Sequence, residues 1–513
     1  MTSTPLSDLK DAVFDTVVIG GGINGASAAL QAAAAGYSTL LVEKNDFGSG
    51  ATGRSSRLLH CGLRYLEAPN GIVSFLRHPS SLRVALRMAR QGMQARRDMV
   101  LTSKARTRAM TLLFPIYRQG PYPAWQVDLA FKILGRMAPD DVPLNYRRMR
   151  KEEAMRNPLV QALSNLDDLD SVACFTEYQM DWPERLCIDA VLDARRMGAT
   201  ALNYTEASLG EMADGYRNIR LSETDDPANT VAVKARSTLL MAGNWIDETL
   251  RKTNPNLPRK TFGTKGASIV VKLGDACRDF GIATVNSKGE PFYCLPWHDR
   301  HYIGPTETPY DGNLDDVHAD TDDIDFIIQE TGNLFPGLGI KPGDIKATWA
   351  GVRPLTYDPA YPKGKRSREI HDLSAFGLEK TFAMTAGPVM TYRSGGKELV
   401  NFLKATLPPS GRESKPDFAP PPLPDNTNSP PLTQKDPAIR LDHLRSFVTH
   451  EQARNLTDLL YRRSGLALRH ELGEDEIASA ADILSSELGW NPAQRDAEIL
   501  RYRQETERLF GIP

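Results

Sequence analysis

The chain has few cysteines, almost no net charge and no long apolar run, and each absence excludes a class of protein. The five cysteines among 513 residues are widely scattered without a C-x-x-C pair, so we expect neither a zinc site nor a disulfide framework. A reducing, cytoplasmic compartment fits this usage best. The formal net charge of −2 provides no basic excess for a nucleic-acid partner.

A segment able to cross a membrane is also missing. No apolar run reaches the roughly 18 residues that span a bilayer, and the polar residues 1–10 leave no room for a signal peptide. Any membrane contact should therefore be peripheral. From 69 to 155 the pattern is helical, and most of its arginines share one side of a helix: Arg77, Arg83, Arg87, Arg90, Arg96 and Arg97. This basic face is either solvated or a contact for anionic lipid.

The sequence does contain enough hydrophobic residues to form more than one core. Hydrophobic residues make up 41% and charged residues 25%, as in ordinary globular proteins, and the length predicts two or three cooperating regions. Residues 408–437 are rich in proline and predict an extended linker between a region at 1–407 and a small helical domain at 438–513. Within the first region, strand-like runs such as 237–241 and 268–271 alternate with helical stretches, which indicates a mixed α/β unit.

A run of glycines carries the clearest chemical signal. It lies between an apolar run at 14–19 and an alanine-rich helical stretch at 23–35, and it satisfies G-x-G-x-x-G. Gly20 permits a tight turn, Gly22 lets the backbone approach a pyrophosphate, and Gly25 allows close packing of the helix on the strand. The N-terminus of the helix then faces the phosphate charge. With Asn24 inside the same motif, this segment predicts a dinucleotide site.

Glu43 strengthens this prediction because it ends the next apolar run, 18 residues after Gly25, where a carboxylate can bind a ribose. NAD and FAD share this pattern. The glycine- and serine-rich residues 44–57 favour FAD, since such a loop offers many backbone N–H groups to phosphates and to the edge of a flavin. Within it, Thr52 and Ser56 are candidate contacts of the cofactor.

With the residues after this loop, the sequence resembles the FAD-dependent glycerol-3-phosphate dehydrogenases from Phe14 to about Leu509, and it matches them least at 77–155 and in the proline-rich linker. Residues 56–67 match the family's Ser-Lys-Leu-x-His-Gly-Gly-Leu-Arg-Tyr-Leu-Glu stretch, with Arg57 and Cys61 as departures. Five further segments are similar to family motifs or to the family's helical cap: Ala242–Asp247, Leu295–Thr306, Trp349–Leu355, Thr391–Arg393 and Glu451–Arg463.

The resemblance implies an α/β fold. An FAD-binding, Rossmann-like domain of the glutathione-reductase type would be interleaved with a mixed α/β substrate domain and followed by a small C-terminal helical domain. It further implies flavin contacts at Gly243 and Thr391, and substrate contacts at Arg64 and Arg353, because a guanidinium can bind phosphate in a bidentate manner. Either arginine could instead close a salt bridge within the fold.

Two departures fall in the implied substrate pocket. Where the family has Gly-Gly-Lys, this chain has Pro388 in the lysine position, so a cation and a backbone N–H are missing. Where the family has Lys-Gly-Ser-His, Ser268 stands in the place of the histidine. His298 and His301 come close after Pro296 and Trp297 and could supply a replacement base, although a lone histidine is more often a surface or packing residue.

The resemblance implies a function in which FAD accepts a hydride from a secondary alcohol, glycerol-3-phosphate or a related polyol phosphate. A quinone or oxygen would then take the electrons. The basic stretch favours a quinone and peripheral contact with the inner face of the cytoplasmic membrane. Two alternatives stay open: an FAD oxidoreductase of an amino acid or 2-hydroxy acid, and a non-catalytic flavin-binding redox sensor. A homodimer is also compatible with the sequence.

Overall fold

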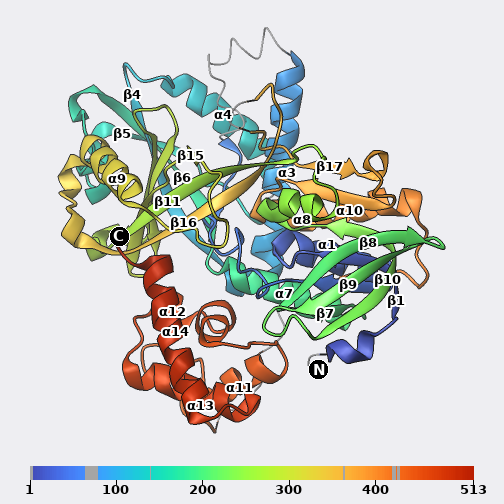
Figure 1. Ribbon diagram of the computed structural model, residues 1–513. Coiled ribbons are helices and arrows are strands. Elements are labelled where there is room, and N and C mark those ends of the chain that lie inside the picture. Colours follow the sequence, from blue (N-terminus) through green and yellow to red (C-terminus); the bar gives the residue numbers. More distant parts are fainter. Residues whose placement is uncertain are drawn as a thin grey trace.

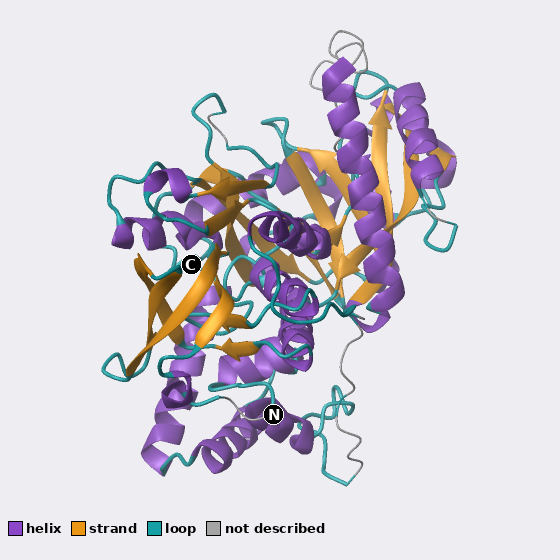
Figure 2. Ribbon diagram, turned by 90° about the vertical axis from the view of Figure 1, so that its right-hand side faces the viewer, coloured by secondary structure: helices purple, strands orange, loops and turns teal. Residues whose placement is uncertain are grey.

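The structure is a computed structural model that describes residues 4–63, 79–138, 140–361, 364–416, 418, 423 and 428–513. These residues form two sheets with helices packed against them, and a group of helices follows at the C-terminus (Figure 1). The two sheets stand apart as separate groups of strands when the molecule is turned by 90° (Figure 2). The expected α/β fold with a C-terminal helical region is confirmed.

The first sheet contains the predicted β-α-β unit: β1 (Val13–Ile19), α1 (Ile23–Ala34) and β2 (Thr39–Val42). β1 pairs in parallel with both β2 and β10, and its Val17 and Val18 are fully buried. Val18 packs with α1 and two further helices, whereas Val17 faces β8 and β9, so both faces of the strand are covered. The strand order is β17-β18-β10-β1-β2-β7, and β9 joins β8 to β10. The remaining strands are β7 (Thr200–Leu202), β8 (Thr205–Ala213), β9 (Tyr216–Glu223), β10 (Thr230–Leu240), β17 (Glu369–Asp372) and β18 (Thr381–Thr385).

Alanines let α1 lie close to its neighbours. α1 packs between α7 (Pro183–Arg196) and α10 (Tyr392–Thr406), while α8 (Ile246–Thr253) lies beside β8. A Cβ on Gly396 of α10 would lie 2.5 Å from the Ser27 hydroxyl of α1, so the two helices meet where both side chains are small. The carboxyl ends of β1, β2 and β10 therefore meet at one edge beside the start of α1, the place where sheets of this kind bind ligands.

The second sheet is mostly antiparallel, in the order β15-β11-β14-β13-β12-β4-β6-β3, with β16 on β11 and β5 on β6. One of its faces packs against α5 (Lys151–Ala154), α6 (Pro158–Gln161) and α9 (Thr321–Leu334). Its strands are β3 (Leu58–Leu59), β4 (Thr107–Tyr117), β5 (Arg147–Arg150), β6 (Leu169–Met180), β11 (Thr261–Val271), β12 (Phe280–Val285), β13 (Pro291–Trp297), β14 (Arg300–Gly304), β15 (Thr308–Pro309) and β16 (Ile345–Thr356).

The expectation that residues 69–155 are helical is only partly right. The helices α3 (Pro79–Thr102) and α4 (Ala124–Met137) are present, but β4 and β5 lie between and after them. β4 is a strand because it pairs with β6 over its whole length, a long-range contact that local periodicity does not contain.

The arginines of α3 also do not form one continuous face. Arg83, Arg87 and Arg90 are exposed, whereas Arg96 is fully buried and lies 3.4 Å from the Glu177 carboxylate. Arg77 lies outside the described residues. No helix in the described part of the chain is both long and apolar enough to cross a membrane.

The C-terminal region contains α11 (Leu441–Thr449), a π-helical turn (Asp458–Arg463), α12 (Leu466–Arg469), α13 (Glu474–Leu488) and α14 (Pro492–Phe510). The proline-rich segment before it was expected to be an extended linker. Of its described part, Leu432 is 7% exposed and donates its N–H to the Ile439 carbonyl, so the end of this segment packs with the helices. The proposed boundaries at 407 and 437 stay predictions.

Candidate active site

The glycine turn between β1 and α1 has the shape that the motif predicts. Gly20 has φ of 109°, and a Cβ there would lie 2.6 Å from the Met241 backbone. A Cβ on Gly25 would lie 1.8 Å from the Gly20 carbonyl oxygen, which only glycine tolerates. A Cβ on Gly22 would meet only the Thr52 hydroxyl, at 3.4 Å. Gly22 is thus open on the side where a pyrophosphate would approach.

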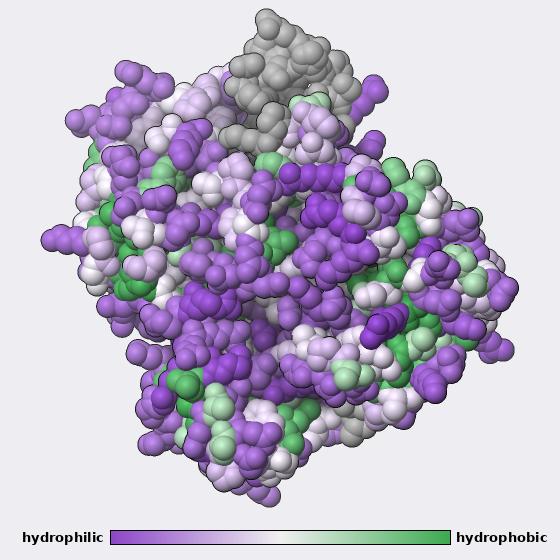
Figure 3. Space-filling view, viewed as in Figure 1, coloured by the Kyte–Doolittle hydropathy of each residue, from purple (hydrophilic) through white to green (hydrophobic). Residues whose placement is uncertain are grey.

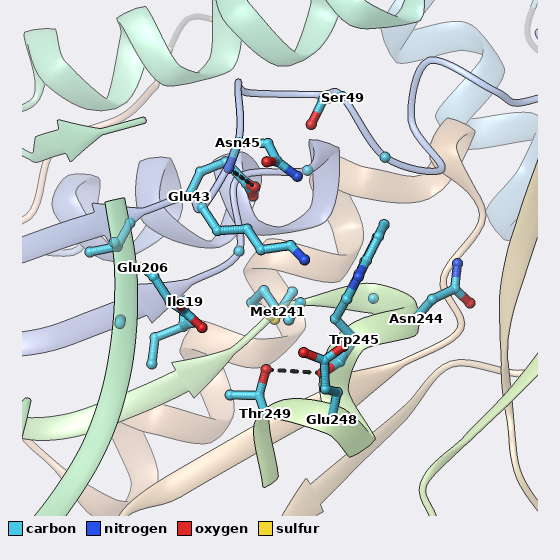
Figure 4. A pocket seen from close by; sticks show the side chains of 18 of the residues that line it. Ile19, Glu43, Asn45, Ser49, Glu206, Met241, Asn244, Trp245, Glu248 and Thr249 are labelled. Carbon is cyan, nitrogen blue, oxygen red and sulfur yellow. Dashed lines mark hydrogen bonds between the residues drawn. The ribbon is translucent and has the colours of Figure 1, made fainter. Parts of the chain in front are cut away.

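A pocket lies against this turn at the carboxyl edge of the first sheet (Figure 4). Six of the predicted cofactor residues line it: Gly20, Gly22, Asn24, Glu43, Thr52 and Gly243. Its other walls come from residues 205–209 of β8 and from α8. The first turn of α1 begins at this pocket without a side-chain cap on Gly22, so the helix presents its positive end to it.

Glu43 follows β2 directly and points into the pocket. Its two carboxylate oxygens accept hydrogen bonds from the backbone N–H groups of Gly21, at 2.6 Å, and Asn45, at 2.9 Å. Burial raises the pKa of this carboxyl, although both N–H donors lower it. Each oxygen still has a lone pair to offer, so the carboxylate is positioned to accept the hydroxyl groups of a ribose.

Several buried polar atoms of the pocket have no hydrogen-bond partner within the described residues: Asn24 Oδ1, Asn244 Oδ1 and Trp245 Nε1. The Trp245 ring stands across the pocket from Glu43, with the Lys44 ammonium 4.9 Å from the ring centroid (Figure 4). Unpaired buried polar atoms are costly unless a ligand satisfies them. An open glycine cradle, a carboxylate, orphaned polar atoms and an aromatic face together fit a dinucleotide such as FAD.

The serine- and glycine-rich loop after β2 joins the pocket to the second sheet. The Thr52 hydroxyl accepts a hydrogen bond from the Ile23 N–H at 3.0 Å, and Tyr302 of β14 donates to the Ser56 carbonyl at 2.5 Å. A Cβ on Gly351 of β16 would lie 2.5 Å from the Arg54 Cβ, so the loop rests directly on the sheet. Ser56 is exposed and lies outside the pocket lining.

Two other predicted cofactor residues also lie outside the lining. Gly25 lies behind the pocket, where α1 contacts the glycine turn at Gly20. Thr391 ends a short turn before α10, where its hydroxyl donates to the Pro388 carbonyl at 3.1 Å. The roles assigned to Ser56 and Thr391 in holding the flavin stay predictions.

Arg353 lies on β16, opposite Thr264 of β11, and is followed by Pro354, which lines the pocket. A Cβ on Gly266 would lie 2.6 Å from Nη2 of Arg353, so the guanidinium occupies space that a larger residue would fill. The neighbouring Val352 carbonyl accepts a hydrogen bond at 2.7 Å from Asn244, next to Gly243. Arg353 is therefore held close to the cofactor pocket, while Arg64 lies outside the described residues.

The structure shows the surroundings of the two departures from the family motifs, Pro388 and Ser268. Ala386 and Gly387, with φ of 55° and 92°, form the turn before Pro388, and the Gly387 carbonyl accepts a hydrogen bond from Asn24 at 3.1 Å. This turn is thus tied to the glycine motif. Ser268 is buried, and a Cβ on Gly304 would lie 2.9 Å from its hydroxyl, so little space surrounds it.

His298 does not lie beside Arg353, which corrects its expected place in the substrate pocket. The β13–β14 turn that carries His298 lies beside Val271 of β11, whereas Arg353 is opposite Thr264. Seven residues of strand separate these positions, on the order of 20 Å. His298 pairs instead with Asp181 at 3.2 Å, and its pKa is lowered to about 4, first by burial and then by nearby arginines despite Asp181.

His301 is also not a candidate base. Its Nε2 lies 3.1 Å from the Cys277 carbonyl oxygen and 3.2 Å from that of Phe280, and its side chain is buried. The positions of His298 and His301 could not be predicted from their closeness to the Pro-Trp pair in sequence. That closeness does not show at which end of the sheet the hairpin turn lies.

The sequence did not single out several residues that line the cofactor pocket, chiefly Lys44, Trp245, Lys252 and residues 206–208. Trp245 lies in the segment Ala242–Asp247, which is similar to a family motif. A rule that an aromatic residue directly after a glycine turn lines the pocket would have identified it. Lys252 and β8 come from distant segments, and only the pairing of β8, β9 and β10 brings them to β2.

Comparisons with known proteins agree with this geometry. The family described as FAD dependent oxidoreductase (DAO) matches residues 15–392. A glycerol-3-phosphate dehydrogenase of Synechocystis is 28% identical over 93% of this chain and 85% of its own, and an aerobic glycerol-3-phosphate dehydrogenase of Bacillus subtilis is 25% identical over 94% and 82%.

Solved structures show the same fold. The glycerol-3-phosphate dehydrogenase of Bacillus halodurans complexed with FAD has a TM-score of 0.74 at 18% identity, covering 98% of this chain and 96% of that one. Glycine oxidase of Geobacillus kaustophilus has a TM-score of 0.56 at 17% identity, covering 80% and 99%. The chain therefore belongs to the DAO family of FAD-dependent oxidoreductases, with FAD as its cofactor.

Proposed function

We propose that this enzyme oxidises the secondary alcohol of glycerol-3-phosphate, or of a related polyol phosphate, to a ketone. One observation carries the proposal: the likeness to glycerol-3-phosphate dehydrogenases extends through the C-terminal helices. The structure of the Bacillus halodurans enzyme matches nearly the whole chain, whereas the family match ends at residue 392 and glycine oxidase leaves a fifth of the chain unmatched.

In this proposal the residues of the glycine turn, Glu43 and Thr52 hold the cofactor, and Arg353 holds the substrate. When bound, FAD supplies the acceptor for the hydride that leaves the alcohol carbon. The Arg353 guanidinium offers parallel N–H groups to a phosphate or to a developing oxyanion. Its place on a strand, beside Gly266, gives it little freedom to move, which favours one orientation of the substrate.

The reduced enzyme must pass its electrons on, and we propose a quinone as their acceptor. The support is the exposed row of Arg83, Arg87 and Arg90 on α3, which would bind anionic lipid and bring the protein to the membrane surface. Oxygen is the alternative acceptor. A faster turnover with a water-soluble quinone than with oxygen would support the first, and hydrogen peroxide formed in proportion to product would support the second.

A second candidate function is the oxidation of an amino acid or 2-hydroxy acid. Pro388 and Ser268 favour it, because the cation and the histidine expected for a phosphorylated substrate are absent from these two positions. A third reading is a flavin-binding sensor without a substrate.

Anaerobic reduction of the bound flavin separates the three. We expect glycerol-3-phosphate or another polyol phosphate to bleach the flavin absorbance, while glycine derivatives and 2-hydroxy acids do not. Bleaching by an amino or hydroxy acid alone would move the function to the second candidate. If only dithionite reduced the flavin, reversibly, the sensor would be the better description.

A further inference from the structure

A second cavity lies on the other side of the loop that rests on the second sheet. It occupies about 1230 Å³ between the ends of β11, β13, β14 and β16 and the C-terminal helices. Gly53 and Arg57 line this cavity, whereas residues 49–52 of the same loop line the cofactor pocket, and the two share no lining residue. A hydrophilic furrow separates the C-terminal helices from the body of the molecule on the face shown in Figure 3.

Its walls carry an excess of positive charge. Seven lysines and arginines line it: Arg57, Lys272, Arg300, Lys346, Lys435, Arg469 and Arg503. Only three carboxylate residues do, namely Asp299, Glu471 and Glu507. Both walls contribute cations. Four of them pair with carboxylates, namely Arg57 with Glu184, Arg300 with Asp299, Arg469 with Asp436 and Arg503 with Glu474.

Three of these cations lie on neighbouring strands. Val271 of β11 pairs with His301 of β14, which places Lys272 opposite Arg300. Lys346 is the bulge residue of β16, between Ile345 and Ala347, which pair with Val271 and Val270. Lys272 and Lys346 are exposed and have no ion-pair partner among the described residues. Two lysine ammonium groups without an ion-pair partner at the mouth of a cavity can bind the phosphates of a ligand.

The inner end of the cavity is aromatic. Trp297 and Trp349 lie edge to face with their centroids 5.4 Å apart, and both are more than nine-tenths buried. The indole Nε1 of Trp297 is buried and has no hydrogen-bond partner within the described residues. Such a donor is costly to leave unpaired, and the ring nitrogen or carbonyl of a heterocycle would satisfy it.

We propose that this cavity is a second ligand site, which binds a nucleoside polyphosphate while FAD occupies the glycine-turn pocket. The Arg57 guanidinium lies over both rings, 5.1 Å from the Trp297 centroid and 5.7 Å from that of Trp349. The base therefore lies beside Arg57 and accepts a hydrogen bond from Trp297, and the phosphates lie between Lys272, Lys346 and the cations of the C-terminal helices. The volume is enough, since pockets for ligands of this size measure roughly 300 to 1,000 Å³. The site is independent of the substrate that the flavin oxidises.

Calorimetric titration of the FAD-loaded protein tests this proposal, with ATP, inorganic triphosphate and adenosine as probes. We expect ATP to bind at least tenfold more tightly than either of the others, and more weakly as salt rises. The double variant Lys272→Gln/Lys346→Gln should weaken ATP and triphosphate binding at least tenfold. Trp297→Phe, which keeps a ring but removes the N–H, should weaken ATP about fivefold and leave triphosphate unchanged.

Lys132→Gln/Lys397→Gln is the matched control, because it removes the same charge from two exposed lysines outside the cavity. It should bind ATP as the wild type does. Three results would overturn the proposal: no binding of ATP to the FAD-loaded protein, equal weakening by both double variants, or release of FAD at the concentrations at which ATP binds. Equal affinity for ATP and triphosphate would overturn the nucleoside assignment.

Discussion

The guanidinium of Arg463 donates a 2.8 Å hydrogen bond to the carboxylate of Asp46, and neither side chain is exposed to solvent. Asp46 lies three residues after Glu43, and Arg463 lies in the C-terminal region. The pair therefore ties the loop of the cofactor pocket to the helices that follow the proline-rich segment. Arg462 pairs with the same carboxylate, and Asn203 donates to it at 2.9 Å.

Replacing Asp46 with asparagine should destabilise the protein strongly. Burial by itself raises the pKa of Asp46, but Arg463 and Arg462 outweigh it and lower the pKa to about 2. Asp46→Asn would leave the buried Arg463 guanidinium without its ion pair, at a cost of about 3 to 5 kcal/mol, while Arg462 keeps its pair with Asp458. Thermal unfolding measures this. Asp315→Asn, which removes an exposed partner of Lys44, should change the midpoint little, and a similar midpoint for both variants would contradict the role of the buried pair.

A methyl group on Gly25 should prevent the cofactor pocket from forming. The Cβ of Gly25→Ala would lie 1.8 Å from the Gly20 carbonyl, so α1 or the turn must move, at a cost of about 3 kcal/mol or more. The purified variant should lack flavin absorbance. Gly135→Ala is the control, because nothing lies within 4 Å of a Cβ there, and it should keep its flavin and gain up to about 1 kcal/mol. A yellow, stable Gly25→Ala protein would show that the turn is not closely packed.

Local patterns predicted the unit around Gly20 and Glu43 because each of its features is local: two apolar runs, an alanine-rich helix and a glycine turn. β4 escaped prediction since it becomes a strand only by pairing with β6, far along the chain. The place of His298 was predicted wrongly for a related reason. Its neighbour Trp297 belongs to a family-like motif, but the sequence does not show at which end of the sheet the turn after Trp297 lies. Lys252 reaches the cofactor pocket only through the packing of α8 beside β8.

Glu177 should make stability fall as pH rises. Burial raises the pKa of this carboxyl to about 7 from its ordinary 4.5, and Arg96 only partly opposes the shift. The folded protein therefore binds a proton more tightly than the unfolded chain. The protonated Glu177 adds about 3 kcal/mol to the free energy of unfolding. This contribution is fully present below pH 4.5 and is lost as the pH rises through 7.

Chemical denaturation at several pH values between 4.5 and 7 tests this prediction. Glu177→Gln should remove the fall in the free energy of unfolding across that range, while Arg96 keeps its hydrogen bonds to backbone carbonyls of residues 142, 143 and 176. Glu152→Gln, at an exposed position, should leave the slope of the wild type. An unchanged slope in Glu177→Gln would exclude this carboxyl as its source.

Arg353→Lys should impair turnover of the polyol phosphate more than it impairs the fold. Lysine keeps the charge but lacks the planar fork, so we expect a loss of at least 100-fold in kcat/KM, or about 2.7 kcal/mol of transition-state stabilisation. Flavin content should stay normal. Arg259→Lys changes an exposed arginine paired with Asp311 and should keep full activity. Wild-type kcat/KM in Arg353→Lys would remove this residue from the substrate site.

The exposed arginines of α3 should govern attachment to membranes, if the enzyme delivers electrons there. Each contributes about 1 kcal/mol near an anionic surface, so Arg83→Gln/Arg87→Gln/Arg90→Gln should weaken binding to phosphatidylserine vesicles by about 100-fold. Flotation of protein with vesicles measures the bound fraction. The triple variant Arg136→Gln/Arg220→Gln/Arg251→Gln removes the same charge from exposed positions outside α3 and should float like the wild type. If both triple variants lost binding equally, overall charge and not the face of α3 would determine attachment, and the argument for a quinone acceptor would lose its support.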